Sequence, residues 1–106
     1  MSREPSRKIK DKVLNAVNQI PYGNVVTYGM VGDHVGLIAR TVGWIMASLN
    51  DEEMKKVPWH RVVGAGGTIP AIKYGFRGQV QIDRLIKEGF KQKNNRVIVE
   101  DKYYLW

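Results

Sequence analysis

Apolar residues recur at every third or fourth position near the start of the chain. They are Ile9, Val13, Val17 and Ile20, and polar residues stand between most of them. This spacing predicts an amphipathic helix over residues 6–19 that turns one face to a core. The stretch 21–24 contains Pro, Gly and Asn and is expected to end that helix.

The next segment has the signals of two short helices separated by a tight turn. Residues 25–26 are valines that favour extended structure, and Thr27 is a suitable N-cap for a helix over residues 28–35. Gly36 ends that helix, and apolar residues at helical spacing predict a second helix over residues 38–49. Such a pair predicts a helix-turn-helix.

The middle of the chain is polar and rich in turn-forming residues. Residues 50–56 predict a loop, after which Pro58 favours an extended entry into residues 59–63. A glycine-rich turn over 64–67 precedes Thr and Ile at 68–69, so a small hairpin or wing is expected there.

The last third combines one helix with two strands. Residues 70–78 show no convincing period, whereas apolar residues at helical spacing over 80–86 predict a helix closed by Gly89. The apolar residues of 97–99 and 103–105 look like two strands around an intervening turn.

Length and composition bound the class of protein. The 106 residues suit a single domain over 1–106, mainly α with small β elements (α/β), with a winged helix-turn-helix. No apolar run is long enough for a membrane span or a signal segment, so we expect a cytoplasmic protein. Cysteine is absent and His34 lies far from His60, which argues against disulfides and a metal site. We expect a monomer without metal or cofactor.

The charge balance points to an anionic partner. Seventeen Lys and Arg residues against ten Asp and Glu give a net charge of +7, which attracts polyanions over long distances. Nucleic acid is the first candidate, although many small basic proteins bind nothing in particular.

One face of the predicted second helix has almost no side chains. Ala39, Gly43 and Ala47 recur every four residues and therefore lie on the same face. A glycine inside a helix costs about 0.5–1 kcal/mol relative to alanine, so either another helix packs closely there or a ligand approaches. Arg40 lies beside this face, where it either enters a nucleic-acid groove or remains a solvated surface charge.

Residues 57–63, VPWHRVV, are the most specific string in the chain. They resemble the active-site motif of the O6-alkylguanine-DNA alkyltransferases, with Trp59 where that family has its alkyl-accepting cysteine. This replacement is typical of the alkyltransferase-like proteins. In order and spacing the resemblance covers about residues 13–90. The other matching segments are 20–23, 27–29, 39–43 and 87–89.

The resemblance implies a DNA-binding surface and a pocket. Tyr28 corresponds to a tyrosine that helps to rotate a nucleotide out of the duplex, and Arg40 to an arginine that fills the vacated place in the base stack. The implied DNA-binding residues are Thr27, Tyr28, Ala39, Arg40, Gly43 and Ala47. The implied pocket for an alkylated base comprises Tyr28, Pro58, Trp59, Lys73 and Tyr74.

The resemblance also implies a remnant of catalytic machinery. His60 and Glu88 match the histidine and glutamate that activate the family's cysteine, and Asn50 matches its hinge asparagine. Alkyl transfer needs a polarizable nucleophile that gives up its proton, which an indole is not. Trp59 offers a flat apolar surface and one N–H donor, although without the flanking motif a core tryptophan is the preferred interpretation. His60 and Glu88 are then expected to survive as a structural pair.

These observations predict a non-enzymatic DNA-damage recognition protein. It would bind O6-alkylguanine in double-stranded DNA by minor-groove helix-turn-helix docking and nucleotide flipping, and pass the lesion to nucleotide excision repair proteins. One alternative is an active alkyltransferase or another DNA-modifying enzyme that uses His60 and Glu88 as acid and base. A second alternative is a winged-helix transcription regulator, whose recognition helix should carry more base-reading side chains than Arg40.

Overall fold

The computed structural model describes residues 7–71 and 76–106. Within these residues the fold is mainly helical, with four strands of two or three residues each. The helices are α1 (Arg7–Val17), α2 (Tyr28–Val35), α3 (Ala39–Ala47), α4 (Asp51–Lys56) and α5 (Phe76–Lys87). The strands are β1 (Val26–Thr27), β2 (Val62–Val63), β3 (Lys91–Lys93) and β4 (Arg96–Ile98). Three short 3-10 helices are η1 (Trp59–Arg61), η2 (Ala65–Gly67) and η4 (Asp101–Tyr103).

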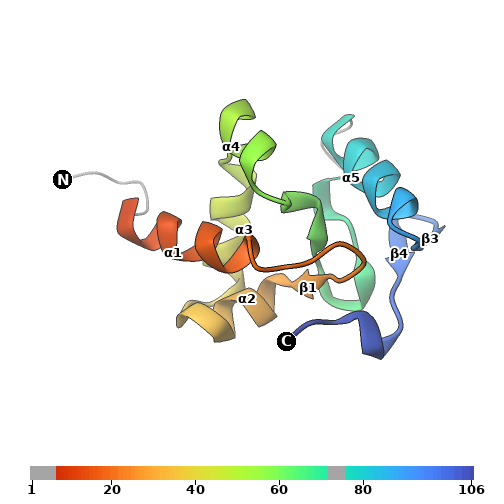
Figure 1. Ribbon diagram of the computed structural model, residues 1–106, viewed down its shortest axis with the longest axis horizontal. Helices are drawn as coiled ribbons and strands as arrows, with labels where there is room; N and C mark the ends of the chain where they lie inside the picture. The colour runs from red at the N-terminus through yellow and green to blue at the C-terminus, as the bar shows by residue number, and fades with distance from the viewer. Residues whose placement is uncertain (1–6, 72–75) are drawn as a thin grey trace.

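The elements form two groups along the longest axis of the molecule (Figure 1). Helices α1 to α4 make one group, and α5 with the hairpin of β3 and β4 makes the other. Strands β1 and β2 lie between them as a parallel pair, with Val26 opposite Val62 and Thr27 opposite Val63. None of the helices in the described ranges has the length and apolar character needed to cross a bilayer.

The predicted helix-turn-helix is confirmed as α2 and α3. Thr27 begins α2, because its Oγ1 accepts a hydrogen bond from Met30 N at 3.1 Å. Gly36 ends α2 in the left-handed conformation with φ +80°, which a residue without Cβ adopts freely. The chain turns tightly before α3, and a Cβ on Gly32 would clash with the Leu37 carbonyl oxygen.

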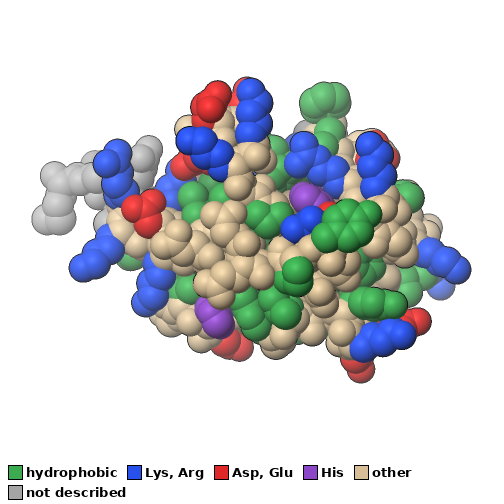
Figure 2. Space-filling model, viewed as in Figure 1, with side chains coloured by type: hydrophobic (Ala, Val, Ile, Leu, Met, Phe, Trp, Pro, Cys, Tyr) green, Lys and Arg blue, Asp and Glu red, His purple; other side chains and the backbone are tan. Residues whose placement is uncertain are grey.

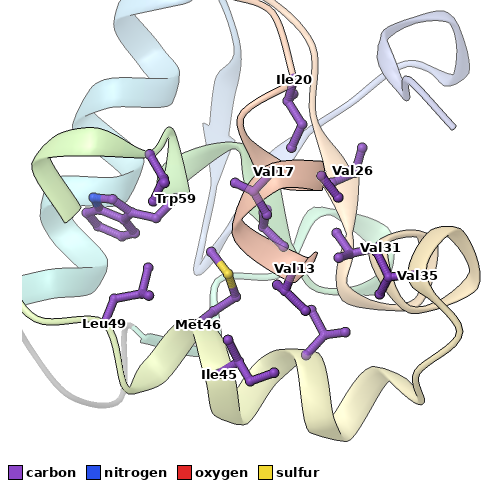
Figure 3. Packing of buried hydrophobic residues seen from close by; sticks show 14 residues of the cluster. Val13, Val17, Ile20, Val26, Val31, Val35, Ile45, Met46, Leu49 and Trp59 are labelled. Carbon is purple, nitrogen blue, oxygen red and sulfur yellow. The ribbon is translucent and has the colours of Figure 1, made fainter. Parts of the chain in front are cut away.

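Two buried clusters stabilise the two groups of elements. The first fills the space between the helices of the first group and includes Trp59, which Figure 3 shows at one edge of the cluster. The second lies beneath α5 and includes Ile82 and Leu85. The β1–β2 pair joins them, because Val26 belongs to the first cluster and its neighbour Val25 to the second.

The prediction of a loop over residues 50–56 is wrong. The segment forms α4, with Asn50 and Glu53 in a capping box whose two hydrogen bonds measure 2.9 and 3.0 Å. Three acidic residues in the first turn and two lysines in the last complement the helix dipole. Apolar spacing did not reveal α4 because no residue of this helix is buried.

The predicted strand pairings also need correction. Residues 59–61 are a 3-10 helix instead of an extended segment. The hairpin expected around 64–69 is absent, because β2 pairs with β1 and Thr68 bridges to Arg96. Likewise β4 pairs with β3 and not with residues 103–105, which return beside Val25. The pattern showed extended segments but not their partners, since pairing depends on contacts distant in sequence.

The helix predicted from the apolar residues of 80–86 is confirmed as α5, which extends beyond this pattern at its start. It begins at Phe76 and is followed by Gly89 at φ +102°, as expected for a left-handed residue after a helix end. The buried face of α5 carries Gly78, Gln81, Ile82 and Leu85.

Two neighbouring glycines provide a test of the loop between β2 and residue 68. Gly66 and Gly67 both have positive φ, but only Gly67 would place a Cβ against the Val97 carbonyl oxygen. We expect Gly66→Ala to cost about 1–2 kcal/mol of unfolding free energy from the left-handed backbone alone. Gly67→Ala should cost at least about 3 kcal/mol, because a backbone clash adds to the same strain. Urea denaturation of both variants measures the difference, and equal losses would contradict this packing.

Candidate nucleic-acid interface

A cavity of about 670 Å³ opens between α3, η1 and the start of α5. Its lining combines aromatic and small residues with two arginines, and the described residues contribute no carboxylate to it. The lining residues are Tyr28, Ala39, Arg40, Gly43, Met46, Ala47, Trp59, Pro70, Ala71, Arg77 and Gln81. Most of the sequence-predicted site residues therefore meet at one place.

The small-residue face of α3 is open and is not a helix-packing surface. Ala39, Gly43 and Ala47 all line the cavity. A Cβ built on Gly43 would have no described atom of a neighbouring element within 4 Å. Within residues 7–71 and 76–106 no helix packs on this face, so the interpretation that another helix packs there is wrong.

Trp59 is both a core residue and a wall of the cavity. Its side chain is only 3% exposed and belongs to the first buried cluster, yet it also lines the cavity. The guanidinium carbons of Arg77 and Arg84 lie 5.1 and 5.4 Å from the centre of its ring, as in cation–π contacts. Its buried Nε1 has no hydrogen-bond partner among the described residues. The interpretation of Trp59 as a core residue is confirmed, and its role against an alkylated base stays a prediction.

Tyr28 and Arg40 occupy different parts of the cavity. Burial raises the pKa of the Tyr28 hydroxyl, more than the positive charge of Arg77 lowers it, so the phenol stays neutral and able to donate. Arg40 is exposed near the start of α3 and makes no ion pair with a described residue. It is free to reach an external ligand.

Some predicted site residues lie elsewhere. Thr27 caps α2 and Pro58 precedes η1, and neither lines the cavity. Lys73 and Tyr74 lie outside the described residues, so their pocket role stays a prediction. Asn50 caps α4.

Sequence reasoning missed Arg77 and Gln81. Gln81 is 2% exposed, and its Nε2 donates to the carbonyl oxygens of His60 at 3.2 Å and Val62 at 2.8 Å. It thereby fixes the VPWHRVV segment against α5. A signal for it was present, since Gln81 lies on the apolar face of the predicted helix. Arg77 precedes the apolar pattern of that helix and had no such signal.

Glu88 is the centre of a buried polar network. Its carboxylate lies 2.5 Å from His60 Nε2 and accepts hydrogen bonds from Arg61 Nε at 3.0 and 3.1 Å. It also accepts the Gly23 N–H at 2.8 Å. Arg61 in turn donates to the Ile20 carbonyl oxygen at 2.9 Å. One carboxylate thus connects the end of α5, η1 and the turn after α1.

The environment of this network favours a neutral histidine and an ionised glutamate. Burial lowers the pKa of His60, and the nearby Glu88 carboxylate offsets this only in part. Burial alone would raise the pKa of Glu88, but hydrogen bonds from Arg61, Gly23 and His60 outweigh it and the pKa is lowered. His60 Nδ1 is buried without a partner, which fits a neutral ring with its proton on Nε2. No group of three metal-ligating side chains occurs in the described part of the chain.

Basic side chains are spread over the surface in view. Figure 2 shows Lys and Arg scattered over α1, α4 and α5 instead of gathered in one patch on that face. At the cavity, in contrast, Arg40 and Arg77 line the same hollow, and Arg84 lies beside Trp59.

A helix-turn-helix with an open, small-residue second helix and adjacent arginines defines a DNA-binding domain. The profile of the family described as "6-O-methylguanine DNA methyltransferase, DNA binding domain" matches residues 8–90. The chain belongs to this family, and within it resembles the alkyltransferase-like proteins.

Comparisons with individual proteins agree with this family membership. Alkyltransferase-like protein 1 of Schizosaccharomyces pombe is 46% identical over 80 residues, which cover 74% of this chain and 72% of that protein. The crystal structure of the same yeast protein in complex with damaged DNA containing O6-carboxymethylguanine superposes with a TM-score of 0.81. In this superposition the two sequences are 36% identical, and the match covers 96% of the present chain and 98% of the yeast chain. A protein of Thermus thermophilus named DNA base-flipping protein is 35% identical over 64% of this chain and 42% of its own length.

The Glu88 network predicts that acid destabilises the protein. Because the folded state lowers the pKa of both His60 and Glu88, the unfolded chain binds their protons more tightly. The free energy of unfolding should therefore fall as the pH drops below about 6.5, and further through the carboxylate range. Urea denaturation between pH 7.5 and about pH 4 measures this slope.

Two matched substitutions show whether the loss of stability in acid comes from Glu88. Glu88→Gln should cost about 3–5 kcal/mol near neutral pH, because it removes the buried carboxylate and leaves the half-buried Arg61 without its counterion. Glu52→Gln removes a carboxylate that is 75% exposed, so it should change stability by less than about 1 kcal/mol. Similar losses in both variants would show that Glu88 does not hold the network together.

Proposed function

We propose that this protein is a non-enzymatic sensor of O6-alkylguanine in double-stranded DNA. The observation that carries the proposal is the cavity of about 670 Å³ that opens directly on the small-residue face of α3, beside Trp59. Its size falls in the range of pockets that enclose small ligands, and a flipped base with a short alkyl group is a ligand of that size. Helix α3 would enter the minor groove, and the alkylated nucleotide would rotate into the cavity.

The names of the relatives support this reading. The yeast protein was crystallised with DNA that carries an O6-alkylated guanine, and the Thermus protein is named for base flipping. In the present chain Arg40 is an exposed cation that lines the cavity, and in this proposal its side chain fills the gap that a rotated nucleotide leaves. The neutral Tyr28 hydroxyl, at the start of α2, could donate to the DNA backbone during that rotation.

The lining of the cavity argues against alkyl transfer. By family resemblance Trp59 occupies the position of the alkyl-accepting cysteine, and this chain contains no cysteine. The one hydroxyl among the described lining side chains belongs to Tyr28, whose raised pKa makes it a poor nucleophile. The Ser48 hydroxyl donates to the Ile45 carbonyl oxygen on α3 and is not presented to a substrate. His60 and Glu88 then have a structural role instead of a catalytic one.

Removal of the lesion would fall to other proteins. In this proposal the bound sensor marks the damaged site for nucleotide excision repair in the cytoplasm, and it acts as a monomer. A transcription regulator is the weaker candidate, because α3 offers the cavity only Arg40 together with small and apolar side chains.

The first test compares one duplex with and without a single O6-methylguanine. We expect tighter binding to the modified duplex, because O6-alkylation weakens base pairing and lowers the cost of extrusion. Intact-mass measurement after long incubation should return an unmodified chain of 12.1 kDa. Gain of one alkyl group by the protein would refute the non-enzymatic part of the proposal, and equal affinities would refute lesion recognition.

A second test separates insertion of Arg40 from recognition by Trp59. Arg40→Ala should weaken binding to the lesion duplex by about 1–3 kcal/mol, and much less when the lesion lies in a single strand. Lys91→Ala on β3 also removes one exposed charge, outside the cavity, and serves as the control. It should lower affinity only through the general salt-dependent attraction.

Trp59 needs a conservative change because it is part of the core. Trp59→Ala would cost about 3–5 kcal/mol of stability, so Trp59→Phe is the informative variant. It should reduce the preference for alkylated over normal guanine in both duplex and single strand, with circular dichroism confirming the fold. Loss of the preference with Arg40→Ala in single strands, but not with Trp59→Phe, would reverse the two roles.

A further inference from the structure

The described wall of the cavity carries positive charge without a matching negative one. Arg40 and Arg77 both line it, and no described lining residue is acidic. Arg40 is exposed at the mouth, where water screens its charge, whereas Arg77 is half-buried. The charge of Arg77 is therefore the one that a group inside the cavity would meet.

Arg77 is held in a fixed position. Its two terminal nitrogens donate to the carbonyl oxygens of Met46 at 2.6 Å and Ala47 at 3.1 Å, at the end of α3. Its guanidinium lies 5.1 Å from the centre of the Trp59 ring. A guanidinium has five N–H donors, and these contacts use two of them. Donors thus remain for a ligand placed against Trp59.

The charge of Arg77 is felt across the cavity. It lowers the pKa of the Tyr28 hydroxyl, which lines the cavity from α2, against the larger effect of burial. An anion in the space between them would be attracted in the same way. A partly dehydrated site strengthens such an interaction relative to bulk water.

On this basis we infer that Arg77 makes the cavity selective for O6-substituents that end in a carboxylate. The inference rests on the proposed function and adds the chemical class of the preferred lesion and the residue that determines it. A substituent that lies against the Trp59 ring comes within reach of the Arg77 guanidinium, which would donate a charge-assisted hydrogen bond to the carboxylate. A neutral alkyl group of the same size gains no such bond.

A purely structural role for Arg77 makes a different prediction. If the side chain only holds the end of α3 against α5, its replacement weakens binding of every lesion by the same factor. If it contacts the substituent, its replacement changes the ratio between charged and neutral lesions. The ratio therefore distinguishes the two roles.

The experiment measures affinity for four duplexes of one sequence. They contain guanine, O6-methylguanine, O6-carboxymethylguanine, or the amide analogue of the last, which has the same shape without the charge. Wild type should bind the carboxymethyl duplex at least about tenfold more tightly than the amide duplex, the usual gain from a hydrogen bond to a charged group. Arg77→Gln should bring this ratio close to one, and Arg77→Lys should retain part of it.

Arg84→Gln is the matched control. Arg84 is also on α5 and lies at a similar distance from the Trp59 ring, 5.4 Å, but it does not line the cavity. Its replacement removes the same charge and should leave the ratio between carboxymethyl and amide duplexes unchanged.

Each outcome decides the question. Equal binding of the carboxymethyl and amide duplexes by wild type overturns the inference, and so does a ratio that Arg77→Gln leaves intact or that Arg84→Gln abolishes. Should Arg77→Gln fail to fold, wild type and Arg77→Lys still give the ratio. If wild type prefers none of the modified duplexes to plain guanine, the proposed function itself fails. Preference for all modified duplexes alike would overturn only the selectivity.

Discussion

The carboxylate of Glu88 holds together three segments that are far apart in sequence. It accepts hydrogen bonds from Arg61 in η1 and Gly23 in the turn after α1, and pairs with His60. Burying a charge is costly, so such a network adds little net stability compared with an apolar core of the same shape. The network instead fixes the positions of the segments, because a buried carboxylate can pair with all three partners only when they lie in one arrangement around it. That arrangement places Trp59, the residue before His60, at the edge of the cavity.

Trp59 shows how a core position becomes a binding wall. A side chain that is 3% exposed and packed within the first buried cluster has one rigid orientation, so the surface it offers to the cavity is already formed before a ligand arrives. If the proposed lesion binds against this wall, little conformational entropy would be lost at that residue. The arginines beside its ring limit its movement further. The same packing explains why a large truncation at this position would confuse a loss of recognition with a loss of folding.

The sequence predicted the ends of a helix correctly where the deciding signals lie within a few residues of each other. Thr27 marks the start of α2 as a side-chain cap, and Gly36 marks its end as a left-handed residue. Both signals can be recognised in the sequence without a structure. Helix α4 was missed because its signals are polar, namely a capping box and a charge gradient, and none of its residues is fully buried. Strand partners were missed because β1 meets β2 across more than thirty intervening residues, and no local pattern encodes that meeting. At the site, resemblance assembled most of the cavity wall, whereas Arg77 was found only when α5 was seen beside the end of α3.

The open face of α3 is possible only because the helix is fixed elsewhere. A recognition helix must leave one side without contacts, and Gly43 in its centre weakens it further, by about 0.5–1 kcal/mol. The helix compensates by burying Val42 and Ile45, and also Met46, which packs in the first cluster while lining the cavity. At the start, the Leu37 carbonyl oxygen lies so close to Gly32 of α2 that a Cβ there would clash, which fixes the chain just before α3 against α2. At the end, Arg77 donates to the carbonyl oxygens of Met46 and Ala47 in the last turn, and its charge suits the negative end of the helix dipole. The residue to which we assign selectivity is thus also hydrogen-bonded to the end of α3, so in this inference one side chain would serve both lesion choice and the position of the helix.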